Sequence, residues 1–148
     1  MTSREMASVY WAQARAILRE AEAHLGLEEW NLVVRRCQET VELALKAILR
    51  SYGIEVPALH DVGFALRRNR QRLPAGLAGD VDRLAAVSRR LWREREPSMY
   101  GDEATETPPT ALYSEFDGHE MLAAARDVMA KCAPFLGEPG TAEVTNGT

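Results

Sequence analysis

Histidine and cysteine are scarce in this chain of 148 residues, which holds three of the first and two of the second. No cysteine and histidine stand at the spacing of zinc ligands, so we expect no metal and no cofactor. Cys37 and Cys132 both fall on apolar stripes of predicted helices, which favours buried free thiols over a disulfide. The scarcity thus argues against a zinc module and a disulfide scaffold.

Long apolar runs are also missing. No segment approaches the ~18 apolar residues that a membrane span needs. The N-terminal "MTSREMASVYW" lacks the basic and then apolar pattern of a secretory signal. The composition, 46% apolar and 27% charged, is ordinary for a soluble globular protein. We therefore expect a cytoplasmic protein that does not bind a membrane.

The alternation typical of β-strands is absent, and apolar residues instead recur three and four positions apart. This spacing predicts helices over residues 4–25, 28–52, 62–73 and 81–96, and a last helix that starts at Ser114 or Asp117 and reaches 136. The predicted fold is all-α: an up-and-down bundle of four to five helices, with two long antiparallel helices at the N-terminus. We expect one domain over 1–136 and a flexible tail over 137–148.

Residue types at the helix ends support these boundaries. Ser3, Asp61 and Asp80 each precede an apolar-periodic segment and are the expected N-caps. Pro97 is expected to end the fourth helix. The residues from there to about 114 predict a long loop, and a loop of that length in a compact domain is often functional.

Charge is segregated along the chain, although the total is only −4. Residues 67–95 contain nine arginines and three acids, a net charge of +6, whereas residues 96–148 contain ten acids and two basic residues, a net of −8. A local basic patch can attract phosphates even on an acidic protein. The alternative is a solvated face whose arginines pair with the protein's own acids, and the sequence leaves both open.

Two stretches carry a family resemblance. "LVVRRCQETVELALKAILRSYGIEVPALHDVGFAL", residues 32–66, resembles the central signature of the HEPN (higher eukaryotes and prokaryotes nucleotide-binding) domain family. "LYSEFDGHEMLAAARDVMAKC", residues 112–132, resembles the last helix of that family. The likeness extends over roughly residues 5–136. It implies a bundle of four to five helices that usually dimerises.

The resemblance also implies a range of functions. Many HEPN members are ribonucleases, and others are non-catalytic partners of small nucleotidyltransferases or are thought to bind nucleotides. The nuclease members share the pattern Arg-x(4–6)-His, and two such pairs meet across the dimer interface and cut RNA without metal. Histidine can act as base and acid near neutral pH, while arginine stabilises the charge that builds on the phosphate.

In this chain the pattern falls on "WREREPSMYGDE", residues 92–103. Its arginine matches Arg95 best, with Arg93 as the alternative. At the histidine position stands Tyr100, and no histidine occurs between His60 and His119. This departure argues against ribonuclease activity, because tyrosine is a poor general base at neutral pH. A tyrosine can still bind a phosphate or stack on a base.

Three readings of this stretch follow. Arg95 could pair with Asp102 or Glu103 and hold the helix end together. Alternatively, ligand-binding residues could face a nucleotide or RNA phosphate in a dimer groove: Arg89, Arg93, Arg95, Tyr100 and Asp102. In the third reading Arg95 and Tyr100 are catalytic.

We predict a non-catalytic HEPN homodimer that binds a nucleotide or RNA, or a small nucleotidyltransferase partner in a toxin–antitoxin or defence setting. A divergent metal-independent HEPN ribonuclease and a dimeric scaffold without ligand are the alternatives. His60 is expected to hydrogen-bond the backbone before the third helix. Trp11, Trp30 and Trp92 are expected to pack in the core or the dimer interface.

Overall fold

The computed structural model describes residues 1–56 and 61–137, and within these ranges the regular structure is helical, with one isolated β-bridge. The α-helices are α1 (Ser3–Gly26), α2 (Trp30–Ser51), α3 (Val62–Arg68), α4 (Ala75–Ala78), α5 (Val81–Trp92), α6 (Pro97–Tyr100), α7 (Pro109–Leu112) and α8 (Glu115–Cys132). Short 3-10 turns span Arg70–Arg72 and Ala133–Phe135. The all-α prediction is confirmed.

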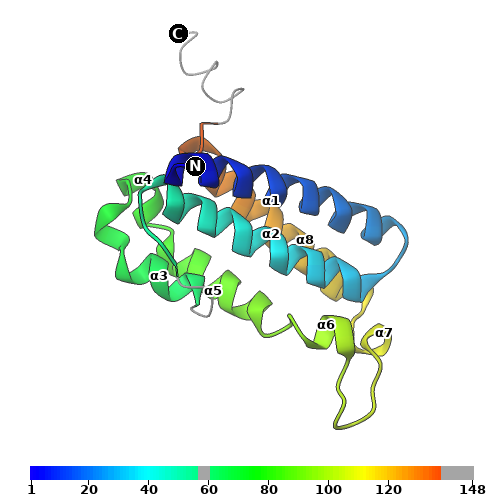
Figure 1. The fold of residues 1–148 in the computed structure, drawn as a ribbon. Helices are drawn as coiled ribbons and strands as arrows, with labels where there is room; N and C mark the ends of the chain where they lie inside the picture. The colour runs from blue at the N-terminus through cyan, green and yellow to red at the C-terminus, as the bar shows by residue number, and fades with distance from the viewer. Residues whose placement is uncertain (57–60, 138–148) are drawn as a thin grey trace.

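The long helices run up and down beside one another (Figure 1). α1 and α2 are antiparallel neighbours along their length, and α8 packs on α2 and also touches α1. α5 packs on α2 and α8, and α3 lies on α5. The end of α5, the start of α2 and the short helices α6 and α7 gather at one end of the bundle, opposite the N-terminus of α1.

α2 forms the centre of the core. Apolar side chains recur along it on more than one face, and those from Val33 to Leu49 are almost entirely shielded from solvent. Leu45 and Ile48 are fully buried. Each such side chain contributes roughly 1.5–3 kcal/mol to folding through burial. α2 is therefore the central helix of the bundle, on which α1, α5 and α8 pack.

The helix starts follow capping chemistry. Thr2, and not Ser3 as predicted, is the N-cap of α1, because Thr2 and Glu5 form a reciprocal capping box. Ser3 lies one position inside the helix, where its Oγ donates a hydrogen bond of 2.8 Å to the carbonyl of Arg50. Ser114 is the N-cap of α8 and forms a capping box with Asp117, which decides between the two predicted starts.

The predicted helix over 62–73 is interrupted. Asp61 caps α3 as expected, its carboxylate accepting from the Gly63 N–H at 2.9 Å. α3 then ends at Arg68, because Asn69 leaves helical geometry and its side chain donates to the carbonyl of Ala65 at 2.8 Å. The 3-10 turn and α4, which the sequence analysis did not predict, complete the connection to α5.

Pro97 begins a helix and does not end one. α5 stops at Trp92, and Asp80 precedes it without a side-chain capping bond. A tight turn over residues 93–96 follows, after which Pro97 occupies the first position of α6. Proline suits that position, since its missing N–H would have no helical partner there. The predicted end at residue 96 was therefore wrong by one turn of chain.

The predicted loop to residue 114 is largely folded. After α6, Gly101 adopts φ +76°, and Asp102 and Thr107 form the isolated antiparallel bridge. The two residues exchange backbone hydrogen bonds of 2.8 and 2.9 Å. This hairpin projects from the α6–α7 end of the bundle (Figure 1).

Two sequence-based expectations meet the limits of the structure. His60 and the tail after Gly137 lie outside the described residues. Of the helices within the described ranges, none combines the length and apolarity that crossing a membrane requires. The same ranges contain no group of three His, Cys, Asp or Glu residues placed to hold a metal ion.

Candidate functional site

The turn over residues 93–96 is anchored to α2 by side chains. Arg35 Nη1 donates to the carbonyl of Arg95 at 2.6 Å, and Ser98 Oγ donates to the same oxygen at 3.2 Å. Asn31 Nδ2 donates to the carbonyl of the buried Ser98 at 3.1 Å. Asn31 and Arg35 lie four residues apart and so share one face of α2. This face fixes the backbone from which Arg95 projects.

The Arg95 side chain lies on an exposed tryptophan. Its Cζ is 4.8 Å from the centre of the Trp92 ring, a cation–π contact. The contact uses no N–H group, so the five guanidinium donors stay available to an anion. Trp92 is 47% exposed in the single chain, so of the two predicted locations, core and dimer interface, the core does not apply to it.

A hollow of about 270 Å³ opens at this point, and its lining is Trp92, Arg93, Arg95, Glu96 and Pro97. Two guanidinium groups and one carboxylate thus border the same space. An anion entering it would meet a net positive charge, and a flat group would meet the indole. The hollow can bind a phosphate beside an aromatic ring.

The arginines of this region divide into paired and unpaired groups. Arg83 and Arg90 form ion pairs with acids of α8 at 2.5 and 2.7 Å. Arg89, Arg93 and Arg95 are exposed and form no ion pair within the part of the chain that the structure describes. The view that the basic block only neutralises the protein's own acids therefore holds for some of its members and fails for these three.

Tyr100 and Asp102 do not line the hollow. Tyr100 ends α6 and is 67% exposed. Asp102 Oδ1 accepts from the backbone N–H groups of Ala104 and Thr105 at 3.1 and 3.3 Å, so this carboxylate stabilises its own turn. The structure thus brings Arg93 and Arg95 to one hollow, whereas Arg89, Tyr100 and Asp102 are not among the residues that line it.

The predicted ion pair between Arg95 and Asp102 or Glu103 does not form among the described residues. The Arg95 and Asp102 side chains each have a different partner. The guanidinium group is stacked on Trp92, and the Asp102 carboxylate is occupied by backbone donors. This stretch is attached to the rest of the fold, but through the backbone carbonyl of Arg95 and not through its side chain.

Tyr113 and Glu94 form a hydrogen-bonded pair at the turn over residues 93–96. Tyr113 Oη donates to Glu94 Oε1 at 2.9 Å. Burial, and next the hydrogen bond to Glu94, raise the pKa of the Tyr113 hydroxyl well above its ordinary value. Tyr113 therefore keeps its proton and acts as a donor, which makes this pair a support for the turn and not a proton-transfer group at neutral pH.

Neither histidine in the described ranges takes the place of the histidine in the family's nuclease pattern. Neither forms a hydrogen bond to Arg95 or Tyr100. His24 Nδ1 lies 2.9 Å from Glu29 Oε1, at the junction of α1 and α2. His119 lies 3.7 Å from Glu115 and its ring centre is 6.2 Å from that of Trp30.

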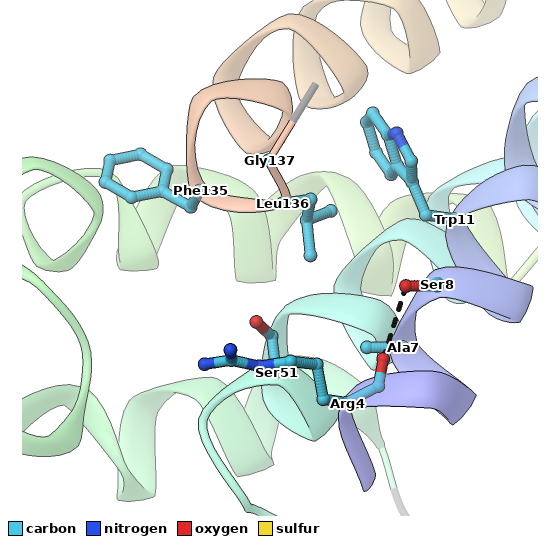
Figure 2. Close-up of a pocket in the computed structure, with 8 residues that line it drawn as sticks. All are labelled: Arg4, Ala7, Ser8, Trp11, Ser51, Phe135, Leu136 and Gly137. Atoms are coloured by element: carbon cyan, nitrogen blue, oxygen red, sulfur yellow. Dashed lines mark hydrogen bonds between the residues drawn. The ribbon is translucent and has the colours of Figure 1, made fainter. Parts of the chain in front are cut away.

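A second cavity, drawn in Figure 2, lies beside the N-terminus of α1, at the end of the bundle away from α6 and α7 (Figure 1). It measures about 310 Å³ and is enclosed by the start of α1, the end of α2 and the segment after α8. Arg4 is its one charged lining residue among those described, and Trp11, Phe135 and Leu136 contribute apolar surface. None of the predicted catalytic or ligand-binding residues borders it.

The residues that build the site were mostly not visible as such in the sequence. Asn31, Arg35 and Ser98 act through contacts 60 residues or more away along the chain, which no local pattern reveals. Trp92 could have been found, since it stands three positions before Arg95, the spacing that brings side chains together on a helix.

Comparison with known proteins agrees with this architecture. The HEPN domain family model matches residues 7–134. The crystal structure of TT1696 from Thermus thermophilus shares the fold with a TM-score of 0.63 and 23% identity, over 85% of this chain and 94% of that one. No curated protein matches the chain in sequence.

Proposed function

The chain belongs to the HEPN domain family, and from this premise we propose that it binds single-stranded RNA or a nucleotide at the hollow beside α5 and α6 without cleaving it. The phosphate would be held by Arg93 and Arg95, with Arg89 adding charge along α5. Trp92 and Tyr100 would offer aromatic faces to a base. Asp102 would shape the neighbouring hairpin and not contact the ligand.

One observation carries this proposal. Arg93 and Arg95 line one hollow with Trp92, and among the described residues both lack an acidic partner of the kind that Arg83 and Arg90 have on the preceding helix α5. An arginine without a protein partner keeps its donors for a phosphate oxygen, and a guanidinium recognises phosphate in a forked geometry. Exposed aromatic rings beside such arginines are typical of single-strand binding, because every base has a face that can stack.

Binding without cleavage follows from the residue types. RNA cleavage through the 2′-hydroxyl needs a base and an acid that exchange protons near neutral pH. The position that carries histidine in the family's nucleases is Tyr100 here. The nearest tyrosine–carboxylate pair, Tyr113 and Glu94, holds its proton firmly. The remaining groups at the hollow are arginines and aromatic rings, which can bind RNA but cannot take up or supply the protons that cleavage requires.

The proposal includes a homodimer formed through the α6–α7 end. Besides the rings of Trp92 and Tyr100, three large apolar side chains are exposed there, on α6, on α7 and at the start of α8: Met99, Leu112 and Phe116. A second copy covering them would remove apolar surface from water. It would also bring two arginine hollows close together, which enlarges the positive surface offered to one RNA strand.

The decisive test combines binding and cleavage on the same protein. Fluorescence anisotropy with a labelled single-stranded RNA is expected to show binding, and gel analysis in EDTA is expected to show the RNA intact. Arg93→Ala with Arg95→Ala should weaken binding at least tenfold. The matched control is Arg83→Ala with Arg90→Ala, which removes the same number of charges from α5 at paired positions and should change binding about twofold or less.

Two results would contradict the proposal. Cleavage in EDTA that disappears in Arg95→Ala would make the chain a ribonuclease. Equal loss of binding in the Arg83/Arg90 control would mean that only net charge matters. For the dimer, light scattering should show a dimer that Phe116→Glu converts to a monomer, whereas Val9→Glu, which changes an exposed valine near the start of α1 at the other end of the bundle, should leave it unchanged.

A further inference from the structure

A groove of about 390 Å³ lies beside α3, where the chain leaves α2. One wall is apolar, formed by Ile54, Val56, Phe64 and Ala65. Arg68 and Arg72 border the same space. The groove is at the end of the bundle away from α6 and α7, so it does not belong to the hollow at Arg95 (Figure 1).

Four arginines on α3 and the 3-10 turn after it fall into two pairs, one bound to an acid and one bordering the groove. Arg67 Nε and Arg70 Nη2 lie 3.3 and 2.7 Å from one Asp82 carboxylate oxygen, so these two share one acid. Arg68 and Arg72 form no ion pair with any described residue. The side chains that border the groove are therefore the two without an acidic partner among the described residues.

Arg72 is held in place without losing its charge. Its Nη2 approaches the carbonyl oxygens of Tyr52 and Gly53, at the C-terminal end of α2, at 3.4 and 3.5 Å. Nε and Nη1 have no hydrogen bond to a described residue, so they stay available to a ligand. The one acid that lines the groove, Glu55, has an arginine of its own, Arg50, at 3.4 Å.

Phe64 adds a flat apolar surface. It is 55% exposed although it belongs to α3, whose other side is packed on α5. Phe64 and Arg68 are four residues apart and share a helix face. A ring and a guanidinium group side by side on an apolar wall match a molecule with an aromatic ring and an anionic group.

From this arrangement we infer a second binding site, for a small aromatic anion. Arg68 and Arg72 hold its carboxylate or phosphate, and its ring lies against Phe64 and the apolar wall formed by Ile54 and Val56. The inference goes beyond the RNA-binding proposal, since it uses other residues at the other end of the bundle, and either can fail without the other.

The test is an NMR titration of the full ¹⁵N-labelled chain with phenyl phosphate, benzoate or inorganic phosphate at millimolar concentration. Phenyl phosphate or benzoate should shift the amide signals of Gly53, Ile54, Ala65 and Asn69 along a saturable curve. The comparison of these two shows whether the site prefers phosphate or carboxylate. Inorganic phosphate should bind at least several-fold more weakly, because it offers nothing to Phe64.

Matched variants separate a built site from a general attraction. Arg68→Ala with Arg72→Ala should abolish the saturable shifts, and Phe64→Ala should weaken binding several-fold. Arg67→Ala with Arg70→Ala removes the same charge from the same segment outside the groove and should leave the binding curve within about twofold. Unchanged signals outside the groove confirm that each variant is folded.

Three results would overturn the inference. One is the absence of saturable shifts with both aromatic anions. Another is equal loss of binding in the Arg67/Arg70 control, which would indicate nonspecific attraction. The third is equal affinity for inorganic phosphate and phenyl phosphate, which would remove the ring from the site. Variants at Arg93 and Arg95 should not alter these titrations, whatever they do to RNA.

Discussion

The Arg35 side chain on α2 donates a hydrogen bond of 2.6 Å to the backbone carbonyl of Arg95. A guanidinium group of the central helix thus positions the backbone of another arginine, whose own guanidinium is stacked on Trp92 and forms no ion pair with a described residue. The arrangement separates the residue that holds the turn from the residue that we propose to face the ligand.

Replacing Arg35 should therefore weaken RNA binding indirectly. In Arg35→Met the Arg95 carbonyl loses its charged donor, which we expect to cost about 1–2 kcal/mol of turn stability. About 1 kcal/mol of that reaching the bound state would lower RNA affinity roughly fivefold. Anisotropy and thermal melting together measure both effects. Lys46→Met, which removes a charge from the same helix at a Glu42 pair, should not alter affinity.

The salt dependence of binding should reveal direct phosphate contact. Each contact with single-stranded nucleic acid contributes a slope of about −0.7 to the plot of log affinity against log salt. Arg93→Ala should make the measured slope shallower by about that amount. Arg35→Met should lower affinity with its slope unchanged, since that residue positions and does not touch. An unchanged slope in Arg93→Ala would remove it from the interface.

Glu96 opposes the proposed ligand. Its carboxylate lines the same hollow as Arg93 and Arg95, where it repels a phosphate. Glu96→Gln should therefore raise RNA affinity, by about two- to fivefold at low salt, with a smaller gain as salt increases. Glu28→Gln, which neutralises an exposed acid at the α1–α2 junction, serves as control. Weaker binding in Glu96→Gln would show that the carboxylate has a structural role.

Gly101 is required by the hairpin after α6. At its φ of +76° an added Cβ would lie 2.2 Å from the carbonyl oxygen of Thr107. Gly101→Ala should cost about 1–3 kcal/mol and open the Asp102–Thr107 bridge. Hydrogen exchange of these two amides would detect the opening. Gly79→Ala, at helical φ with nothing within 4 Å of the new methyl, should instead stabilise the chain by about 0.4–1 kcal/mol.

The buried thiols make stability sensitive to alkaline pH. Burial raises the pKa of Cys37 and of Cys132 to about 12 each. In the unfolded chain both ionise near their ordinary pKa, about 8.5, so the unfolded state gains charge first. Their contribution to stability is complete below that pH and is lost as pH rises toward 12, by roughly 1.4 kcal/mol per thiol and pH unit.

Denaturant unfolding between pH 7 and about 10.5, above the ordinary thiol pKa, measures this loss. Cys37→Ala with Cys132→Ala should be less stable at pH 7, because each change leaves a small cavity, but its stability should fall less steeply above about pH 9. Tyr113 contributes to the alkaline fall in the same direction, since its pKa is also raised. An equally steep fall in the double variant would contradict the assignment to the thiols.

The fold was predictable because its signals are local and repeated. Apolar spacing over 22 residues in α2, and capping residues such as Asp61 and Ser114, each specify helix without reference to the rest of the chain. The boundary at residue 96 failed because Pro97 is compatible with either a helix end or a helix start. Only the packing of the turn on Asn31 and Arg35 selects between them.

The candidate site was predictable in location and not in composition. Arg93 and Arg95 were identified from a spacing pattern, and the structure brings both to one hollow. Tyr100 was selected because it stands at the histidine position of the family pattern, and Asp102 because it follows closely, but α6 and the hairpin after Gly101 decide where the two residues lie. Trp92 was taken as a packing residue, because a single tryptophan on an apolar stripe carries no signal of exposure.

α2 is anchored at both of its ends. Near its start Asn31 and Arg35 hold the turn of Arg95, and the carbonyl groups just past its end hold Arg72, while a 22-residue helix is about 33 Å long. A substitution that loosens the middle of α2, such as Leu45→Ala, would therefore impair both binding regions at once. Simultaneous loss of the two activities in a genetic screen would then report damage to a shared support, and could not be taken as evidence that the regions communicate.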